Sequence, residues 1–84
     1  MKTLKELGEA IALRRRELGL RQRNVALQAG LSPESLSRFE RGHAAEFGSR
    51  KLLSVLAVLG MELQFTASGI SGALDELRRE RAKS

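Results

Sequence analysis

Glycine spacing is the feature of this 84-residue sequence that most limits its fold. The eight glycines stand at positions 8, 19, 30, 42, 48, 60, 69 and 72. Because glycine readily ends helices, most of the segments between them can hold one short helix and little more. No sequence repeat or low-complexity tract interrupts this pattern. The spacing therefore predicts a small, mainly α-helical domain.

The composition is that of a soluble globular domain, and it excludes several kinds of chemistry. Hydrophobic residues make up 42% and charged residues 30% of the sequence. Cysteine is absent, which excludes disulfides, thiolate metal sites and cysteine nucleophiles. No apolar run reaches the length of a membrane span, and the first residues do not begin a secretory signal. We therefore expect a cytoplasmic protein.

The charge balance favours duplex DNA as a partner. The net charge is +5, and eleven of the fifteen basic residues are arginine, whose planar fork of donors suits phosphate and guanine. The three aromatic residues are all phenylalanine, too few to form a stacking platform for single strands. If the partner is a nucleic acid, we expect double-stranded DNA and an association with the nucleoid.

Capping signals and apolar spacing predict four helices between residues 4 and 59. The first spans about 4–18, with a capping box at its start (Thr3 and Glu6) and large apolar residues at helical spacing: Leu4, Leu7, Ile11 and Leu18. The second spans 22–29, and the third follows the N-cap Ser32 and ends at Arg41-Gly42. The fourth takes Ser49 as its N-cap and ends before Gly60. Its predicted apolar face consists of Leu52, Leu53, Val55, Leu56 and Leu59.

Residues 61–66 change from a helical period to a period of two. Apolar and polar residues alternate there, which is typical of a half-buried strand. No other segment reads as a strand, and a single strand leaves its backbone donors and acceptors unpaired. Antiparallel pairing with the same strand of a second copy is the simplest solution. The pattern therefore predicts a homodimer with Met61, Leu63 and Phe65 in its interface.

The chain is predicted to divide into one domain and a tail. Residues 1–69 hold the four helices and the strand, and residues 70–84 form the C-terminal tail. Leu74 and Leu77 are the large apolar residues of the tail apart from Ile70, and its charges are ordered as a helix dipole favours. We expect a tail that is helical or partly disordered, and hence a four- to five-helix domain.

Residues 22–41 predict two short helices that meet at an angle. Gly30 allows the left-handed conformation of a tight turn, and the small side chain of Ala26 lets the second helix cross closely. Three larger apolar residues, Val25, Leu36 and Phe39, fill the angle between the helices. This pattern indicates a helix-turn-helix.

From Ile11 to Leu59 the sequence resembles the Cro/phage-repressor (XRE-like) helix-turn-helix family. The resemblance rests on Arg15, Leu18-Gly19-Leu20-Arg21-Gln22, Val25-Ala26, Ala29-Gly30-Leu31-Ser32 and Leu36-Ser37-Arg38-Phe39-Glu40-Arg41-Gly42. The strand after the fourth helix is similar to that of HipB-like antitoxins and transcriptional regulators, in which two such strands pair across the dimer. The resemblance implies that residues 1–69 are a DNA-binding domain that places the second helix of the motif in the major groove.

The resemblance also implies which residues contact DNA: Gln22, Arg23, Ser32, Pro33, Glu34, Ser35, Ser37, Arg38 and Arg41. Arg38 can donate to guanine, or it can contact phosphate instead. Glu34 can accept from cytosine, or it can serve only the helix dipole. Pro33 departs from the glutamine that is common in the family, which removes one polar base reader.

Other positions are implied to contact phosphate or to hold the fold. Gln22 matches a residue that bonds a phosphate, and Arg21 and His43 are further phosphate candidates. Arg15 and Glu40 match a structural pair that bridges two helices in the family. The run Arg14-Arg15-Arg16 is accordingly interpreted as one buried bridge and two solvated residues.

Two functions from different classes fit these patterns. The first is a homodimeric repressor that binds a palindromic operator, and the second is an antitoxin that neutralises a toxin protein and regulates its own operon. A controller protein of a restriction–modification system is similar in size, but the strand argues against it. The sequence contains no catalytic set and no cofactor or metal motif, so we expect a binding protein rather than an enzyme.

Overall fold

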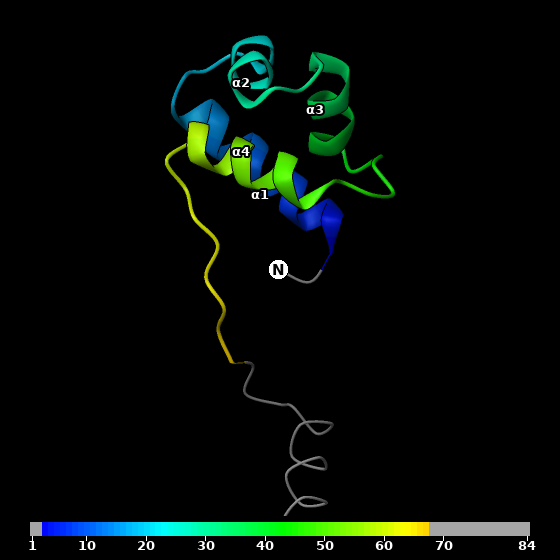
Figure 1. Ribbon diagram of the computed structural model, residues 1–84, viewed down its shortest axis with the longest axis vertical. Coiled ribbons are helices and arrows are strands. Elements are labelled where there is room, and N and C mark those ends of the chain that lie inside the picture. Colours follow the sequence, from blue (N-terminus) through cyan, green and yellow to red (C-terminus); the bar gives the residue numbers. More distant parts are fainter. Residues whose placement is uncertain (1–2, 68–84) are drawn as a thin grey trace, which may run out of the picture.

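The computed structural model describes residues 3–67, and this part of the chain holds four helices and no strand (Figure 1). The helices are α1 (Leu4–Glu17), α2 (Gln22–Ala29), α3 (Pro33–Glu40) and α4 (Ser49–Val58). Within the described part, no helix combines the length and apolar character needed to cross a membrane. The mainly helical fold class is confirmed, and the predicted tail lies outside the described residues.

The helix ends agree with the predicted capping signals except at α4. The Thr3 hydroxyl accepts from the Glu6 backbone N–H at 3.1 Å, and α1 ends at Glu17, one residue before the predicted end. Ser49 was predicted to cap α4, and this is wrong: Gly48 is the N-cap, and Ser49 is already helical. Glycine offers no side-chain acceptor, so α4 begins without a side-chain cap.

The core lies where all four helices meet. Its buried residues are Ile11, Val25, Ala26, Leu31, Leu36, Phe39, Val55, Leu56 and Leu59. Two residues predicted to face inward are instead exposed, Leu18 by 42% and Leu53 by 52%. Leu18 follows the last turn of α1, and Leu53 lies beside the i, i+3, i+4, i+7 stripe that α4 buries.

Helix α1 is held close to its neighbours by a glycine and an arginine. A Cβ atom placed on Gly8 would lie 2.1 Å from the backbone oxygen of Phe39, so α1 and α3 approach closely at this point. Arg14 donates from Nε to the Leu59 carbonyl oxygen at 3.2 Å, which satisfies an acceptor at the end of α4. Arg14 is therefore half-buried and bonded, and its interpretation as a solvated residue is wrong.

Residues 61–67 run away from α2 and α3 in a single extended path (Figure 1). Met61 packs against the core, whereas Leu63 is 47% and Phe65 is 99% exposed. No backbone hydrogen bond joins residues 62–67 to another described residue. A strand needs a neighbour to pair with, so the strand predicted at 61–66 is not formed in the single chain and stays a prediction.

Candidate nucleic-acid interface

Helices α2 and α3 form the predicted helix-turn-helix around Gly30. This glycine has φ of 77° and ψ of 30°, the left-handed conformation that a residue with a Cβ adopts at a cost. The Leu31 N–H bonds the Ala26 carbonyl oxygen at 2.8 Å, and the Gly30 N–H bonds that of Leu27 at 3.2 Å. These two bonds close the end of α2 and turn the chain directly into α3.

Ser32, the predicted N-cap, and the Pro33 that follows it fix the start of α3. The Ser32 hydroxyl accepts from the Ser35 backbone N–H at 3.1 Å, and Pro33 occupies the first turn. Leu36 and Phe39 are buried on the inner face, so the helix can rotate little about its own axis. The opposite face therefore presents a defined set of side chains to the solvent.

One hollow gathers six of the predicted DNA-contacting residues along the outer face of α3. We name it the α2–α3 hollow, and it is lined by Gln22, Pro33, Glu34, Ser37, Arg38 and Arg41. Arg41 donates from Nε to the Ser37 carbonyl oxygen at 3.3 Å, which holds its side chain against the helix. In the described part of the chain no ion pair engages Glu34 or Arg38, although they stand four residues apart on one helix.

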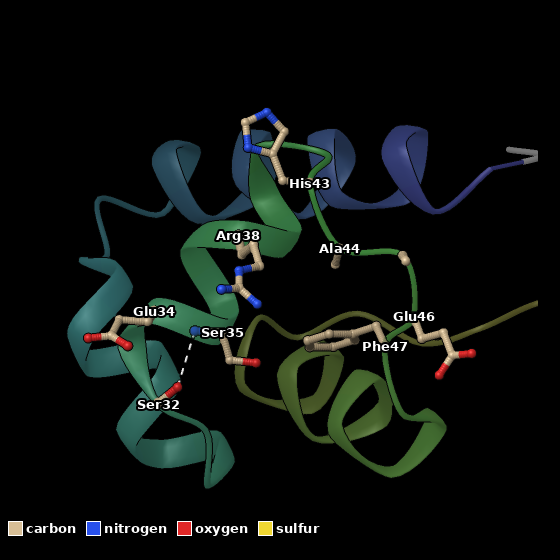
Figure 2. Close-up of a pocket in the computed structure, with 9 residues that line it drawn as sticks. Ser32, Glu34, Ser35, Arg38, His43, Ala44, Glu46 and Phe47 are labelled. Carbon is tan, nitrogen blue, oxygen red and sulfur yellow. Dashed lines mark hydrogen bonds between the residues drawn. The ribbon is translucent and has the colours of Figure 1, made fainter.

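A second hollow opens between α3 and the loop that follows it (Figure 2). We name it the loop hollow, and it is lined by Ser32, Glu34, Ser35, Arg38 and residues 43–47. The Arg38 guanidinium projects between α3 and the loop, while Glu34 points away from it (Figure 2). Phe47 stacks on Phe39 with ring centroids 4.0 Å apart and planes at 3°, which ties the loop to the core.

Behind these hollows the carboxylate of Glu40 binds two side chains. Arg15 donates from Nε to Oε2 at 2.8 Å and from Nη2 to Oε1 at 2.9 Å, which confirms the predicted pair. Gln22 donates from Nε2 to the same Oε1 at 2.8 Å. Arg15 also donates from Nη1 to the Leu20 carbonyl oxygen at 2.8 Å. The network thus joins α1, the chain before α2, α2 itself and α3.

The ion pair strengthens the preference of Arg15 for its charged form. Its hydrogen bond to Glu40 raises the pKa of the Arg15 guanidinium above the ordinary value, with burial opposing this and the Glu40 charge adding to it. A raised pKa stabilises the fold at any pH below the unfolded-state pKa. This stabilisation is lost only as the pH rises through the folded-state pKa, at strongly alkaline pH.

The remaining predicted residues lie outside the α2–α3 hollow. Arg21 and Arg23 are exposed at the start of α2 and line neither hollow, and His43 is exposed in the loop after α3. Sequence reasoning missed the bond from Gln22 to Glu40, because no spacing rule links these positions. It also missed the loop residues 44–47, for which the sequence signal was a phenylalanine in a short loop after the third helix.

The comparisons with known proteins identify the class of the domain. A family model described as a helix-turn-helix domain matches residues 1–68. Because this match covers most of the chain, the protein belongs to that helix-turn-helix domain family. No curated protein sequence matches the chain significantly. The fold and the family together indicate a regulator that binds double-stranded DNA.

Proposed function

We propose that this protein is a sequence-specific transcriptional repressor that binds a palindromic operator as a homodimer. The observation that carries the proposal is the outer face of α3, where Glu34 in the first turn and Arg38 in the last turn are exposed and share one hollow with Gln22. A helix presented in this way suits the major groove, whose base edges offer donors and acceptors. Two such helices in a dimer would read half-sites about 34–36 Å apart or a near multiple.

Arg38 and Glu34 are the proposed base readers, with Ser37 beside them. Both charged side chains are exposed, and neither is engaged in an ion pair within residues 3–67. Arg38 can fork onto guanine O6 and N7, and Glu34 can accept from the amino group of cytosine. Because neither side chain is held in an ion pair within residues 3–67, both can bind base edges without breaking one.

The proposed phosphate contacts surround this reading face. Arg23 and Arg41 are exposed and carry charge, whereas Ser35 and Gln22 are half-buried neutral donors. Arg21 and His43 are exposed as well and are further candidates for phosphate contacts. Contacts of this kind set the register of the protein on DNA and make its affinity depend on salt.

We propose that residues 61–66 pair with the same segment of a second copy. This is supported by the near-complete exposure of Phe65, the half exposure of Leu63 and the unpaired backbone of residues 62–67 within the described part. An antiparallel two-fold centred on Leu63 sets Phe65 of each copy opposite Met61 of the other. Because Met61 already packs on the core, Phe65 would then continue that core across the dimer.

Repression requires nothing beyond operator occupancy. We propose no catalytic step and no cofactor, and the protein would act on the nucleoid in the cytoplasm. A dimer seated on a promoter blocks transcription by its presence. In this proposal the operator sequence alone decides which genes are controlled.

Replacement of Arg38 tests the reading face. The duplex is one that the parent protein enriches from a random-sequence pool, and binding is measured by fluorescence anisotropy. If Arg38 reads a base, Arg38→Ala weakens this duplex by about 1–3 kcal/mol and relaxes the selected sequence at one position. The control Arg16→Ala removes the same charge from an exposed site on α1 outside both hollows. Failure of the parent to enrich any sequence would overturn the proposed function.

A charge on the apolar side of residues 61–66 tests the dimer. Leu63→Asp places that charge in the proposed interface, and Gln64→Asp, its control, places it on the opposite side. Light scattering should give about twice the 9.2 kDa chain mass for the parent and the control, and one chain mass for Leu63→Asp. A Leu63→Asp protein that remains dimeric contradicts the pairing.

An antitoxin function is the second candidate. Large apolar side chains are exposed on three helices other than α3, with Leu27 at 77%, Leu13 at 58% and Leu53 at 52%. Apolar surface off the reading face is available to a protein partner while α3 holds DNA. Co-purification of the untagged protein with the product of its neighbouring gene separates the two functions. A stable hetero-complex favours the antitoxin, and a homodimer that binds duplex and retains no partner favours the repressor.

A further inference from the structure

The carboxylate of Glu40 lies at the end of α3 and is bonded to Gln22, which lines the α2–α3 hollow. Its side chain is 2% exposed, and it accepts three N–H bonds of 2.8–2.9 Å, two from Arg15 and one from Gln22. An ionised carboxylate has two oxygens and only accepts. The amide group of Gln22 must therefore turn its nitrogen, and not its oxygen, toward Glu40.

This bond leaves one N–H group of the Gln22 amide for an outside partner. An amide nitrogen carries two N–H groups, and one of them is directed at Glu40. No other hydrogen bond engages the Gln22 side chain within residues 3–67, and Gln22 lines the hollow with Arg38 and Arg41. A second N–H in a hollow that two arginines also line suits an acceptor that carries negative charge.

We infer that Glu40 is a positioning residue that aims the free N–H of Gln22 at a phosphate of the bound DNA. The inference rests on the proposed function and adds a residue that never touches the ligand. A glutamine held by a buried carboxylate keeps one rotamer, so less side-chain entropy is lost on binding.

Arg15 makes this arrangement compatible with an anionic ligand. A bare carboxylate behind Gln22 would repel a phosphate, but Arg15 holds both of its oxygens and neutralises it. The charge of the Glu40 carboxylate is therefore balanced at the distance of the DNA. The ion pair thus has a function beyond its packing role between α1 and α3.

A double-mutant cycle distinguishes positioning from a structural role. The cycle uses two backgrounds, the parent protein and Arg15→Met/Glu40→Met. The double variant removes both members of the buried pair together, so it leaves neither of the two charges buried and unpaired. Gln22→Ala is then measured in the parent and in this background, on the duplex that the parent enriches. We expect a loss of about ten- to 150-fold in the parent, the range of one hydrogen bond to a charged group. In the pair-free background the loss should be less than about twofold.

Salt dependence separates a neutral contact with phosphate from a charged one. Gln22 is neutral and displaces no counterion, so Gln22→Ala should lower affinity by the same factor at every salt concentration. The matched variant Arg23→Ala should reduce the slope of log affinity against log salt by about one. Equal losses from Gln22→Ala in both backgrounds would overturn the inference while the proposed function stands. A parent protein that enriches no sequence would overturn both.

The parent protein allows a second test that does not depend on the fold of any variant. Its side-chain amide protons are observed by NMR, with Gln22 assigned by their absence in Gln22→Ala and the exposed Gln28 as the control. The proton bonded to Glu40 should have a chemical shift different from those of Gln28. Addition of duplex should change the chemical shift of the other Gln22 proton only. If duplex changes the chemical shift of the bonded proton to that of the Gln28 protons, Gln22 leaves Glu40 to bind DNA, and the inference is wrong.

Discussion

The close approach of α1 to α3 at Gly8 makes a strong prediction for the variant Gly8→Ala. An added Cβ would lie 2.1 Å from the Phe39 backbone oxygen and 3.0 Å from its carbonyl carbon. Carbon and oxygen atoms without a covalent bond approach only to about 3.3 Å. The two helices must therefore separate by about 1 Å, because both sides of the contact are backbone or Cβ.

Two opposing terms set the size of the effect. Glycine to alanine within a helix ordinarily stabilises by about 1 kcal/mol. Overpacking costs about 1–3 kcal/mol, and a separation of α1 from α3 also stretches the 2.8 Å bond between Arg15 and Glu40, whose full loss would cost about 3–5 kcal/mol. We expect a net loss of about 2–4 kcal/mol. For a domain of this size that lowers Tm by about 10–30 °C.

The measurement is thermal and urea unfolding followed by circular dichroism, at matched protein concentration. Gly48→Ala is the control, because its added Cβ would meet only the Lys51 side chain, at 4.0 Å, and its φ of −58° suits alanine. The control should change stability by less than about 1 kcal/mol, the cost of exchanging these residues at an N-cap. A Gly8→Ala protein as stable as this control, or more stable than the parent, would refute the close crossing.

Three further substitutions test single features of the fold by the same unfolding measurements. Among the described residues, Arg15→Met leaves Gln22 as the one remaining partner of the buried Glu40 charge, and it should cost about 3–5 kcal/mol, most of which Arg15→Met/Glu40→Met should restore. The added Cβ of Gly30→Ala would have no described atom within 4 Å, but the residue must keep a φ of 77°. This variant should therefore lose about 1–2 kcal/mol of stability from backbone strain alone. Ser32→Ala removes the hydroxyl that accepts from Ser35 and should cost about 1 kcal/mol, whereas Ser32→Asp should retain most of the stability.

Local signals in the sequence were sufficient to predict the helix-turn-helix itself. A cap such as Ser32 or a turn such as Gly30 acts on the residues next to it, so its effect can be derived without knowing the rest of the fold. The same is true of the apolar stripe on α4, apart from the position of Leu53 at its edge. Periodicity states which face is buried, but the crossing angles decide how far the covered area extends.

Features that depend on two distant elements could not be predicted in this way. Gly8 lay inside the predicted first helix without a signal of its own, and its contact with the Phe39 carbonyl depends on how α1 crosses α3. The bond from Gln22 to Glu40 joins residues 18 positions apart and matches no spacing rule. The pair of Arg15 and Glu40 was found only through the family resemblance, because two charges 25 residues apart carry no local signal.

These contacts separate two kinds of position around the reading helix. An eight-residue helix such as α3 is too short to be stable alone, so its place in the domain comes from tertiary contacts such as the Gly8 crossing and the Glu40 network. Glu34 and Arg38 make none of these contacts and are exposed. Changes at Gly8 or Arg15 should therefore alter stability first and DNA affinity in proportion, whereas changes at Glu34 or Arg38 should alter sequence preference at nearly constant stability. A variant library scored for both properties should show two separate groups, and a single line relating affinity to stability would contradict the assignment of reading residues.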